Sequence, residues 1–275
     1  MEKITPWHYF PDHEVVFWRT DWSVNATAFA FKAGPPEGHH TAELLKKFPD
    51  WHLSAGHAHP DANSFIIFAK GRYLTGDSGY SGQPRTDQHN TLLVDGRGQA
   101  AEGEHHDPWE DFPYDQLNQI RISEVQLTKG FAHVKGEAAA AYDKALGLKK
   151  FNRHLVFVAP GRFTVWDEVE AAEPRVFTAL LHSDTTWAEM SERKYAVEAS
   201  GVKLVVDTPT PGTVVKVEPN VVMAPGRPGS VDKGERQHRG DRLALSTNSA
   251  QQTATFVWQM KIQEQAAAST PAGRK

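Results

Sequence analysis

Short apolar segments that alternate with polar positions dominate this chain. In residues 26–32, Phe29 and Phe31 fall on one face of an extended segment, as a half-buried strand requires. Other segments rich in β-branched and aromatic residues also predict strands, and turn signals such as Lys70-Gly71 separate them. The predicted strands are residues 14–19, 26–32, 64–69, 91–95, 119–127, 151–159, 163–169, 175–182, 202–207, 213–218 and 253–261.

Helical periodicity is scarce by comparison. Residues 41–47 predict two helical turns. Many regularly spaced strands with few helices are typical of an antiparallel sandwich. We therefore predict an all-β fold, a large antiparallel β-sandwich with few short helices.

The distribution of Gly, Pro and polar residues sets the expected domain limits. No linker-like stretch divides the chain, so we predict one domain over residues 1–262. Residues 224–242 are polar and rich in Gly and Pro, which predicts a long surface loop. Residues 263–275 are rich in Ala, Gln and Ser and predict a disordered tail.

Composition excludes several classes of function. The 275 residues include no cysteine, which rules out disulfides, thiolate metal sites and a cysteine nucleophile. Any metal must then bind through His, Asp or Glu. The net charge of -4 gives no basic footprint for nucleic acid, and no apolar run is long enough to span a membrane. The first 30 residues also lack the pattern of a signal peptide.

Histidines cluster in the first half of the chain, around His57-Ala58-His59-Pro60-Asp61. A hairpin formed by residues 64–69 and the segment that follows places His59 and Asp77 at its open end, and the next segment returns His89 there. Two imidazoles and a carboxylate with an open position suit Zn²⁺ or another divalent metal. Asp61 is placed to accept the second ring N–H of a ligand histidine.

The two histidines of the His-x-His pair need not share one role. On an extended segment their rings diverge, so one binds the metal while the other faces a cavity. A lone His-x-His is weak support for a metal site, because histidines near loops are often solvated. It is the addition of Asp77 and His89 that favours a metal.

The same residues resemble a known family. The run G-H-A-H-P-D-A-N-S-F-I-I-F-A-K-G-R-Y-L-T-G-D-S-G-Y, followed by H-N-T-L-L-V-D-G, is similar to the heparinase II/III-like C-terminal domain of polysaccharide lyases. The resemblance covers roughly residues 10–185 and is most specific over residues 56–96. It implies a β-supersandwich and a periplasmic or secreted location in a bacterium.

The resemblance also implies roles for single residues. A metal, usually zinc, is held by His59, Asp77 and His89. His57 faces the cleft as a catalytic or substrate-binding group, and Tyr80 is a further candidate for the cleft wall and for catalysis. Full-length relatives carry an N-terminal α/α toroid that supplies the main catalytic groups. This chain has no helical region of that size, so we expect its activity to depend on a separate α/α toroid domain.

The implied reaction is β-elimination on an anionic polysaccharide or oligosaccharide that contains uronic acid. A base removes the C5 proton, the C4 oxygen leaves, and negative charge develops on the carboxylate, where preorganised donors have their largest effect. His57 is the candidate base or carboxylate neutraliser. We expect the metal to fix the cleft wall. Trp51 and Trp109, in polar loops, are candidates for stacking on sugar rings, and Arg85 is a candidate for binding an acidic group.

Two alternatives remain open at this point. A cupin-like metal protein would use His57, His59 and His89 as ligands without Asp77, although Ser64 stands where a cupin has Glu. A non-catalytic carbohydrate-binding β domain would bind glycan without turnover, and its binding would survive loss of His57. Metal affinity after substitution of Asp77 separates the lyase-type site from the cupin-type site.

Overall fold

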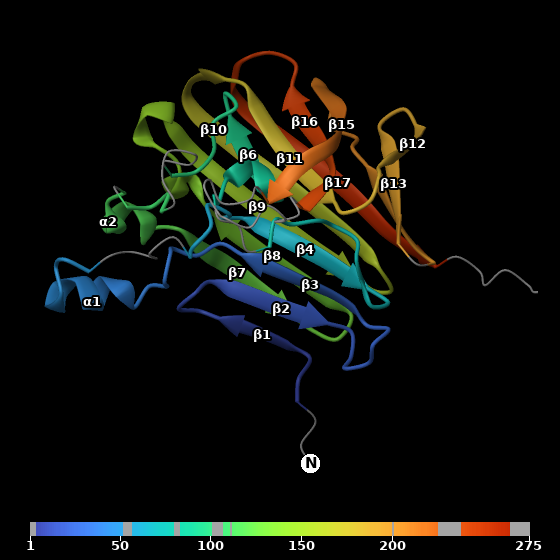
Figure 1. Ribbon diagram of the computed structural model, residues 1–275, viewed down its shortest axis with the longest axis horizontal. Helices are drawn as coiled ribbons and strands as arrows, with labels where there is room; N and C mark the ends of the chain where they lie inside the picture. Colours follow the sequence, from blue (N-terminus) through green and yellow to red (C-terminus); the bar gives the residue numbers. More distant parts are fainter. Residues whose placement is uncertain are drawn as a thin grey trace, which may run out of the picture.

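The computed structural model describes residues 4–51, 57–79, 83–100, 107–110, 112–199, 201–224 and 238–264. These residues form three antiparallel sheets of five, eight and four strands (Figure 1). Their helical segments are short: α1 (Thr41–Lys47), α2 (Tyr114–Leu117) and the 3₁₀ turns η1 (Thr86–Gln88), η2 (Ala139–Ala141) and η3 (Lys144–Leu146). The all-β sandwich predicted from the sequence is confirmed.

The five-stranded sheet is an antiparallel meander in chain order. Its strands are β1 (Trp7–Phe10), β2 (Val15–Arg19), β3 (Thr27–Lys32), β4 (Ser64–Ala69) and β5 (Arg72–Tyr73). Buried and more exposed side chains alternate along β2, β3 and β4, because successive side chains of a strand point to opposite sides of the sheet. Trp18, Phe29, Phe31, Phe65 and Ile67 are buried on the inner face. The outer face carries their neighbours in the sequence.

The eight-stranded sheet has the strand order β12-β13-β14-β17-β10-β9-β8-β7. Its strands are β7 (Arg121–Leu127), β8 (Phe131–Glu137), β9 (Leu148–Val158), β10 (Arg162–Arg175), β12 (Ala188–Ser191), β13 (Lys194–Ala199), β14 (Val202–Asp207) and β17 (Gln251–Glu264). The four-stranded sheet has the order β15-β16-β11-β6, with β6 (Leu92–Val94), β11 (Phe177–Ser183), β15 (Thr213–Ala224) and β16 (His238–Thr247). Figure 1 shows β1 to β4 in front of the green strands of the eight-stranded sheet.

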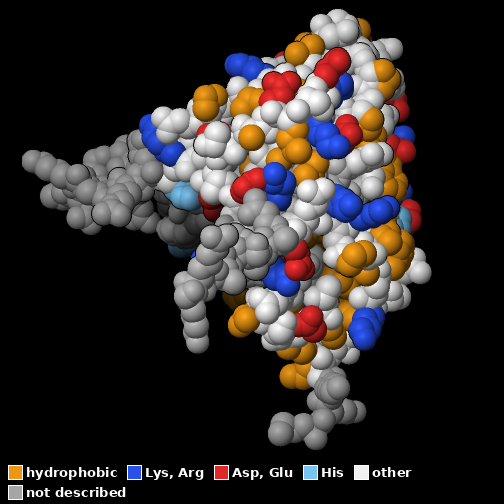
Figure 2. Space-filling model, turned by 90° about the vertical axis from the view of Figure 1, so that its right-hand side faces the viewer, with side chains coloured by type: hydrophobic (Ala, Val, Ile, Leu, Met, Phe, Trp, Pro, Cys, Tyr) orange, Lys and Arg blue, Asp and Glu red, His pale blue; other side chains and the backbone are white. Residues whose placement is uncertain are grey.

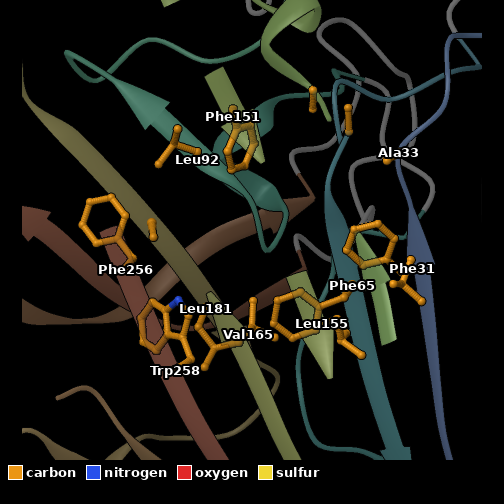
Figure 3. Packing of buried hydrophobic residues seen from close by; sticks show 14 of the residues in the cluster. Phe31, Ala33, Phe65, Leu92, Phe151, Leu155, Val165, Leu181, Phe256 and Trp258 are labelled. Carbon is orange, nitrogen blue, oxygen red and sulfur yellow. The ribbon is translucent and has the colours of Figure 1, made fainter. Parts of the chain in front are cut away.

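One hydrophobic core joins the three sheets. Figure 3 shows Phe31 and Phe65 of the five-stranded sheet, Leu155 and Trp258 of the eight-stranded sheet and Leu181 of the four-stranded sheet in the same cluster. Aromatic rings make several contacts between the layers: Trp18 lies 4.3 Å from Phe157, and Phe29 lies edge-on to Phe163 at 6.2 Å, measured between ring centroids. Such pairs add to the burial of their apolar surface, so the sheets are held in fixed relative positions.

A buried polar centre lies inside this core. Arg153 on β9 and Asp167 on β10 are both 0% exposed and form a bidentate pair, with nitrogen to oxygen distances of 2.6 and 2.7 Å. The third guanidinium nitrogen donates to the carbonyls of Asn63 and Asn90. These two residues stand directly before β4 and directly after His89, so the ion pair fixes the backbone beside the histidine cluster.

Gly136 on β8 allows the sheets to approach closely. A Cβ at this position would lie 2.0 Å from Oδ1 of Asn63 and 2.8 Å from Cβ of Ala33. No side chain fits there without movement of the five-stranded sheet. The Asn63 side chain instead donates to the carbonyls of Gly136 and Phe151, at 3.4 and 3.1 Å.

Two predicted boundaries need correction. Strand β16 begins at His238, inside the predicted loop of residues 224–242, while residues 225–237 lie outside the described part of the chain. Strand β17 continues through Gln263 and Glu264, which pair with β14, so ordered structure extends two residues into the predicted tail. The rest of that tail also lies outside the described residues.

Charges of both signs are interspersed on the face drawn in Figure 2, with no continuous area of Lys and Arg. This mixture agrees with the absence of a basic footprint in the composition. Among the described helices, none is both long and apolar enough to cross a membrane.

Candidate functional site

Three chain segments meet at one end of the five-stranded sheet. The first, around His59, precedes β4; the second, around Asp77, follows β5; the third, around His89, precedes β6. The short β4–β5 hairpin turns the chain back at Lys70-Gly71 and so returns Asp77 toward the start of β4. Asn90 then joins the segments, because its side chain donates to the carbonyls of Phe65 and Gly76 at 2.8 and 2.9 Å.

The side chains Asp77, His89 and His59 form a hydrogen-bonded row. Oδ2 of Asp77 lies 2.8 Å from Nδ1 of His89, and Nε2 of His89 lies 3.2 Å from Nδ1 of His59. The backbone N–H of Gly79 donates to the other Asp77 oxygen at 3.0 Å, and Ser78 Oγ lies 3.5 Å from His59 Nδ1. His89 is 1% exposed and Asp77 is 32% exposed, so the middle of the row is buried while its Asp77 end reaches the surface.

The row has a defined charge distribution. Burial alone would lower the pKa of His89, but the charge and hydrogen bond of Asp77 outweigh it and raise that pKa. Burial likewise would raise the pKa of Asp77, yet His89 holds it below its usual value. Burial and the neighbouring His89 lower the pKa of His59 to about 4. His59 is therefore a neutral imidazole at neutral pH, beside a stabilised carboxylate–imidazole pair.

The donor types suit a divalent metal, but their arrangement does not surround one. Two imidazole nitrogens 3.2 Å apart, with a carboxylate behind one of them, match the chemistry of a histidine metal site. However, no three His, Asp or Glu side chains in the described segments are grouped so that they could hold a metal ion. Asp77 contacts the ring of His89 and stands behind it.

Asp61 has a partner that the sequence did not predict. Its carboxylate accepts a hydrogen bond from Nζ of Lys32, the outward-facing residue at the end of β3. The partner of a histidine N–H is Asp77, as described above. Lys32, opposite Ser64 in the sheet register, binds Asp61, and the role of Asp61 as acceptor for a ligand histidine stays a prediction.

The aromatic candidates occupy different environments. Trp109 is 2% exposed and donates from Nε1 to the carbonyl of Ala58 at 3.0 Å, so its ring belongs to the core and holds the His57–His59 segment in place. Its prediction as a sugar-stacking residue is corrected accordingly. Trp51 is 44% exposed, donates to Glu37 at 2.9 Å, and lines a separate hollow with Glu110.

The remaining candidates lie near the row or outside the described residues. His57 is exposed at the start of the described segment that leads to His59. Arg85 is paired with Asp87, with 3.0 Å between Nε and Oδ1. Tyr80 lies outside the described part of the chain, so the structure assigns it no place.

A cleft of about 640 Å³ opens beside the row. Asp77, Ser78 and Asp61 line it together with Lys32. Asp184 and His238 form part of its lining as well, with 3.1 Å between His238 Nε2 and Asp184 Oδ1. Sequence reasoning missed this pair because the two residues are far apart in the sequence. They meet only because β11 and β16 are paired strands.

Solved structures share this architecture. The heparan sulfate lyase HepC of Pedobacter heparinus aligns with 97% of this chain at a TM-score of 0.70 and 17% identity. The heparinase III BT4657 gene product aligns with 98% of the chain at 0.71 and 16% identity, and another heparinase III structure with 94% at 0.67 and 14% identity. The matched part is 38%, 38% and 37% of those chains, so this chain spans well under half of their length. At such identities the likeness establishes the fold.

The fold and the sequence together define a polysaccharide lyase-family domain. Residues 5–259 match the sequence model of the family described as heparinase II/III-like, C-terminal. The match covers most of the chain, and the chain therefore belongs to the heparinase II/III-like C-terminal family. The resemblance seen in the sequence is thus confirmed.

Proposed function

We propose that this chain is the β-sandwich part of a polysaccharide lyase that cleaves uronic-acid-containing glycans by β-elimination. Heparan sulfate is the first glycan to test, because the solved structures of this fold named above include a heparan sulfate lyase. The observation that carries the proposal is the row Asp77–His89–His59, whose Asp77 lines a cleft that also contains Lys32. A separate α/α toroid domain completes the site, and the enzyme acts in the periplasm or after secretion.

Each group has a role that follows from its environment. The exposed His57 accepts the C5 proton or neutralises the substrate carboxylate. Nε2 of His89 and Nδ1 of His59 share a hydrogen bond whose donor is set by the ring tautomers, so the row holds a proton that can be shared along it. Lys32, paired with Asp61, places its ammonium group in the cleft, where it stabilises the substrate carboxylate as negative charge develops on it. Tyr80 and groups of the toroid domain provide further acid–base function.

The proposal is tested by assay of uronate polysaccharides for unsaturated products, with the chain alone and with a toroid domain added. We expect product only when the two domains are combined, and a fall of about 10²-fold or more in His57→Ala. His40→Ala is the matched control, because His40 is an exposed histidine bound to Asp12. Glycan binding without product, even with the toroid domain present, would instead assign the chain as a non-catalytic carbohydrate-binding domain.

We further propose that the row binds a divalent metal, zinc in the first place, through His59, Asp77 and His89, once the Asp77 carboxylate turns from the His89 ring toward the metal. Its support is the donor chemistry: a histidine kept neutral by burial and a second histidine beside a carboxylate. The metal would supply a fixed positive charge to the cleft wall. No step of the reaction above requires it.

Metal content of the purified chain tests this second proposal. We expect about one zinc per chain, lost in both Asp77→Ala and His89→Ala. Asp12→Ala and His40→Ala are matched controls, because this surface pair is also joined at 2.7 Å. Zinc retained in Asp77→Ala would contradict the assignment of Asp77 as a ligand. Absence of zinc from the purified wild-type chain would contradict the proposal that the row binds zinc.

A further inference from the structure

The outer face of the five-stranded sheet carries a long groove. A hollow of about 740 Å³ lies on this face, next to the cleft beside the histidine row. Both are lined by the same four residues, Phe17, Ala30, Ile66 and Tyr73. The hollow and the cleft are therefore two parts of one continuous groove that begins at Asp77.

Small side chains on β3 form the floor of the groove. The outward positions of this strand are Ala28, Ala30 and Lys32. In the register of the sheet, Ala30 lies between Phe17 on β2 and Ile66 on β4. Two alanines flanked by larger residues on both neighbouring strands leave a channel along the strand direction. The groove is thus a consequence of the pattern of side-chain sizes on one face of the sheet.

The walls of the groove are aromatic and unusually exposed. Phe17 is 53% exposed, Tyr73 58% and Trp22 61%. Tyr73 packs edge-on against Phe68, with 5.3 Å between the ring centroids. A contiguous exposed apolar surface of this kind is more often a binding site than a surface without function. Flat rings with a polar edge suit the apolar faces of sugar rings, whose hydroxyls stay in water.

A basic side chain lies at each end of the groove. Lys32 lines the end beside Asp61 and Asp77, where it is ion-paired with Asp61. Arg19 lines the other end, where its guanidinium lies 4.9 Å from the centre of the Trp22 ring. The two ends are separated by the length of β2 from Val15, opposite Lys32, to Arg19, or about 13 Å. Aromatic walls that end at the Arg19 guanidinium suit a chain in which sugars and acidic groups repeat.

We propose that this groove binds the part of an acidic polysaccharide that extends beyond the reacting unit, with Phe17 and Tyr73 stacking on sugar rings and Arg19 binding an acidic group. The inference rests on the proposed function and extends it from the cleft to the outer face of the sheet. The groove determines how long a glycan must be for full affinity. Continuity with the cleft and the Arg19 guanidinium at the far end favour a glycan over a purely apolar partner.

Binding of size-defined heparan sulfate oligosaccharides to the full chain tests the groove. We expect a decasaccharide to bind the wild type more tightly than a tetrasaccharide. Ala30→Phe, which fills the floor, and Tyr73→Ala, which removes a wall, should each weaken decasaccharide binding by about tenfold, the effect of losing one well-packed ring. Binding of the tetrasaccharide should stay within about twofold of wild type.

Two variants outside the groove serve as matched controls. Ala188→Phe places the same new ring on the exposed strand β12, and Val158→Ala removes an exposed apolar side chain at the end of β9. Neither should change binding of either oligosaccharide. Two results would contradict glycan binding in the groove: equal affinity for the decasaccharide and the tetrasaccharide, or decasaccharide binding that Ala30→Phe and Tyr73→Ala do not change. Neither result would contradict the proposed function.

Two further outcomes have separate meanings. If Ala30→Phe blocks association with a toroid domain but leaves decasaccharide binding intact, the occupant is a protein domain and the glycan proposal is wrong. If the wild type binds neither oligosaccharide, with or without a toroid domain, both the proposed function for this glycan class and the proposed role of the groove are wrong.

Discussion

Replacement of Arg153 by methionine is expected to lower the free energy of unfolding by about 3–5 kcal/mol. The guanidinium is fully buried and pairs with the Asp167 carboxylate through two hydrogen bonds. Its loss leaves that carboxylate buried without a counter-charge and frees the carbonyls of Asn63 and Asn90. Removal of one partner of a buried pair has a much larger effect than removal of both.

Urea denaturation of three variants checks this expectation. Arg121→Met is the control, because Arg121 pairs with Glu137 on the surface and is 59% exposed, so it should lose less than about 1 kcal/mol. The double variant Arg153→Met with Asp167→Leu should be more stable than Arg153→Met alone. An Arg153→Met protein as stable as Arg121→Met would show that the buried pair does not hold the sheets together.

The second large effect is a loss of stability in mild acid caused by His182. Burial, together with the nearby Arg242 charge, lowers the pKa of His182 from 6.5 to about 3 in the folded protein. The folded state therefore binds fewer protons than the unfolded state below pH 6.5, and stability falls as the pH decreases. Between pH 7 and pH 5 this one residue should remove about 2 kcal/mol.

The slope of stability against pH isolates the contribution of His182. Its ring contacts the Asp87 carbonyl from Nε2 at 2.9 Å, a contact that a glutamine amide can replace. In His182→Gln the other titrating groups remain. The loss of unfolding free energy between pH 7 and pH 5 should therefore be smaller by about 2 kcal/mol than in the wild type, whatever the stability at pH 7. An unchanged slope would mean that His182 is protonated in the folded protein.

The fold was predictable where one local pattern decided it. Alternation in β3 and the apolar run of β4 gave strands within a residue of their observed bounds, and the helix α1 was predicted without error. Strand β8 was missed because Gly136 and the three polar or charged residues His133, Lys135 and Glu137 leave it with a weak apolar pattern. Its inner positions carry small residues, since the five-stranded sheet approaches closely there. Only the packed structure contains that information.

The site was predictable to the level of chain segments. Hairpin geometry correctly brought His59, Asp77 and His89 together, because spacing and turn position determine which segments meet. The hydrogen-bond partners were not predictable: Asp61 binds Lys32, and the buried Trp109 donates to the carbonyl of Ala58. These contacts depend on the register of paired strands and on how far the loop that carries Trp109 is buried. Neither is encoded in a local motif.

The adjacency of His89 and Asn90 links the cleft to the interior. The ring of His89 belongs to the row beside the cleft, while the side chain and carbonyl of Asn90 tie together β4, β9 and β11. A ligand that immobilises His89 therefore restrains the same backbone that Arg153 holds. We expect glycan or metal binding to slow amide hydrogen exchange in these strands, well beyond the residues that the ligand touches.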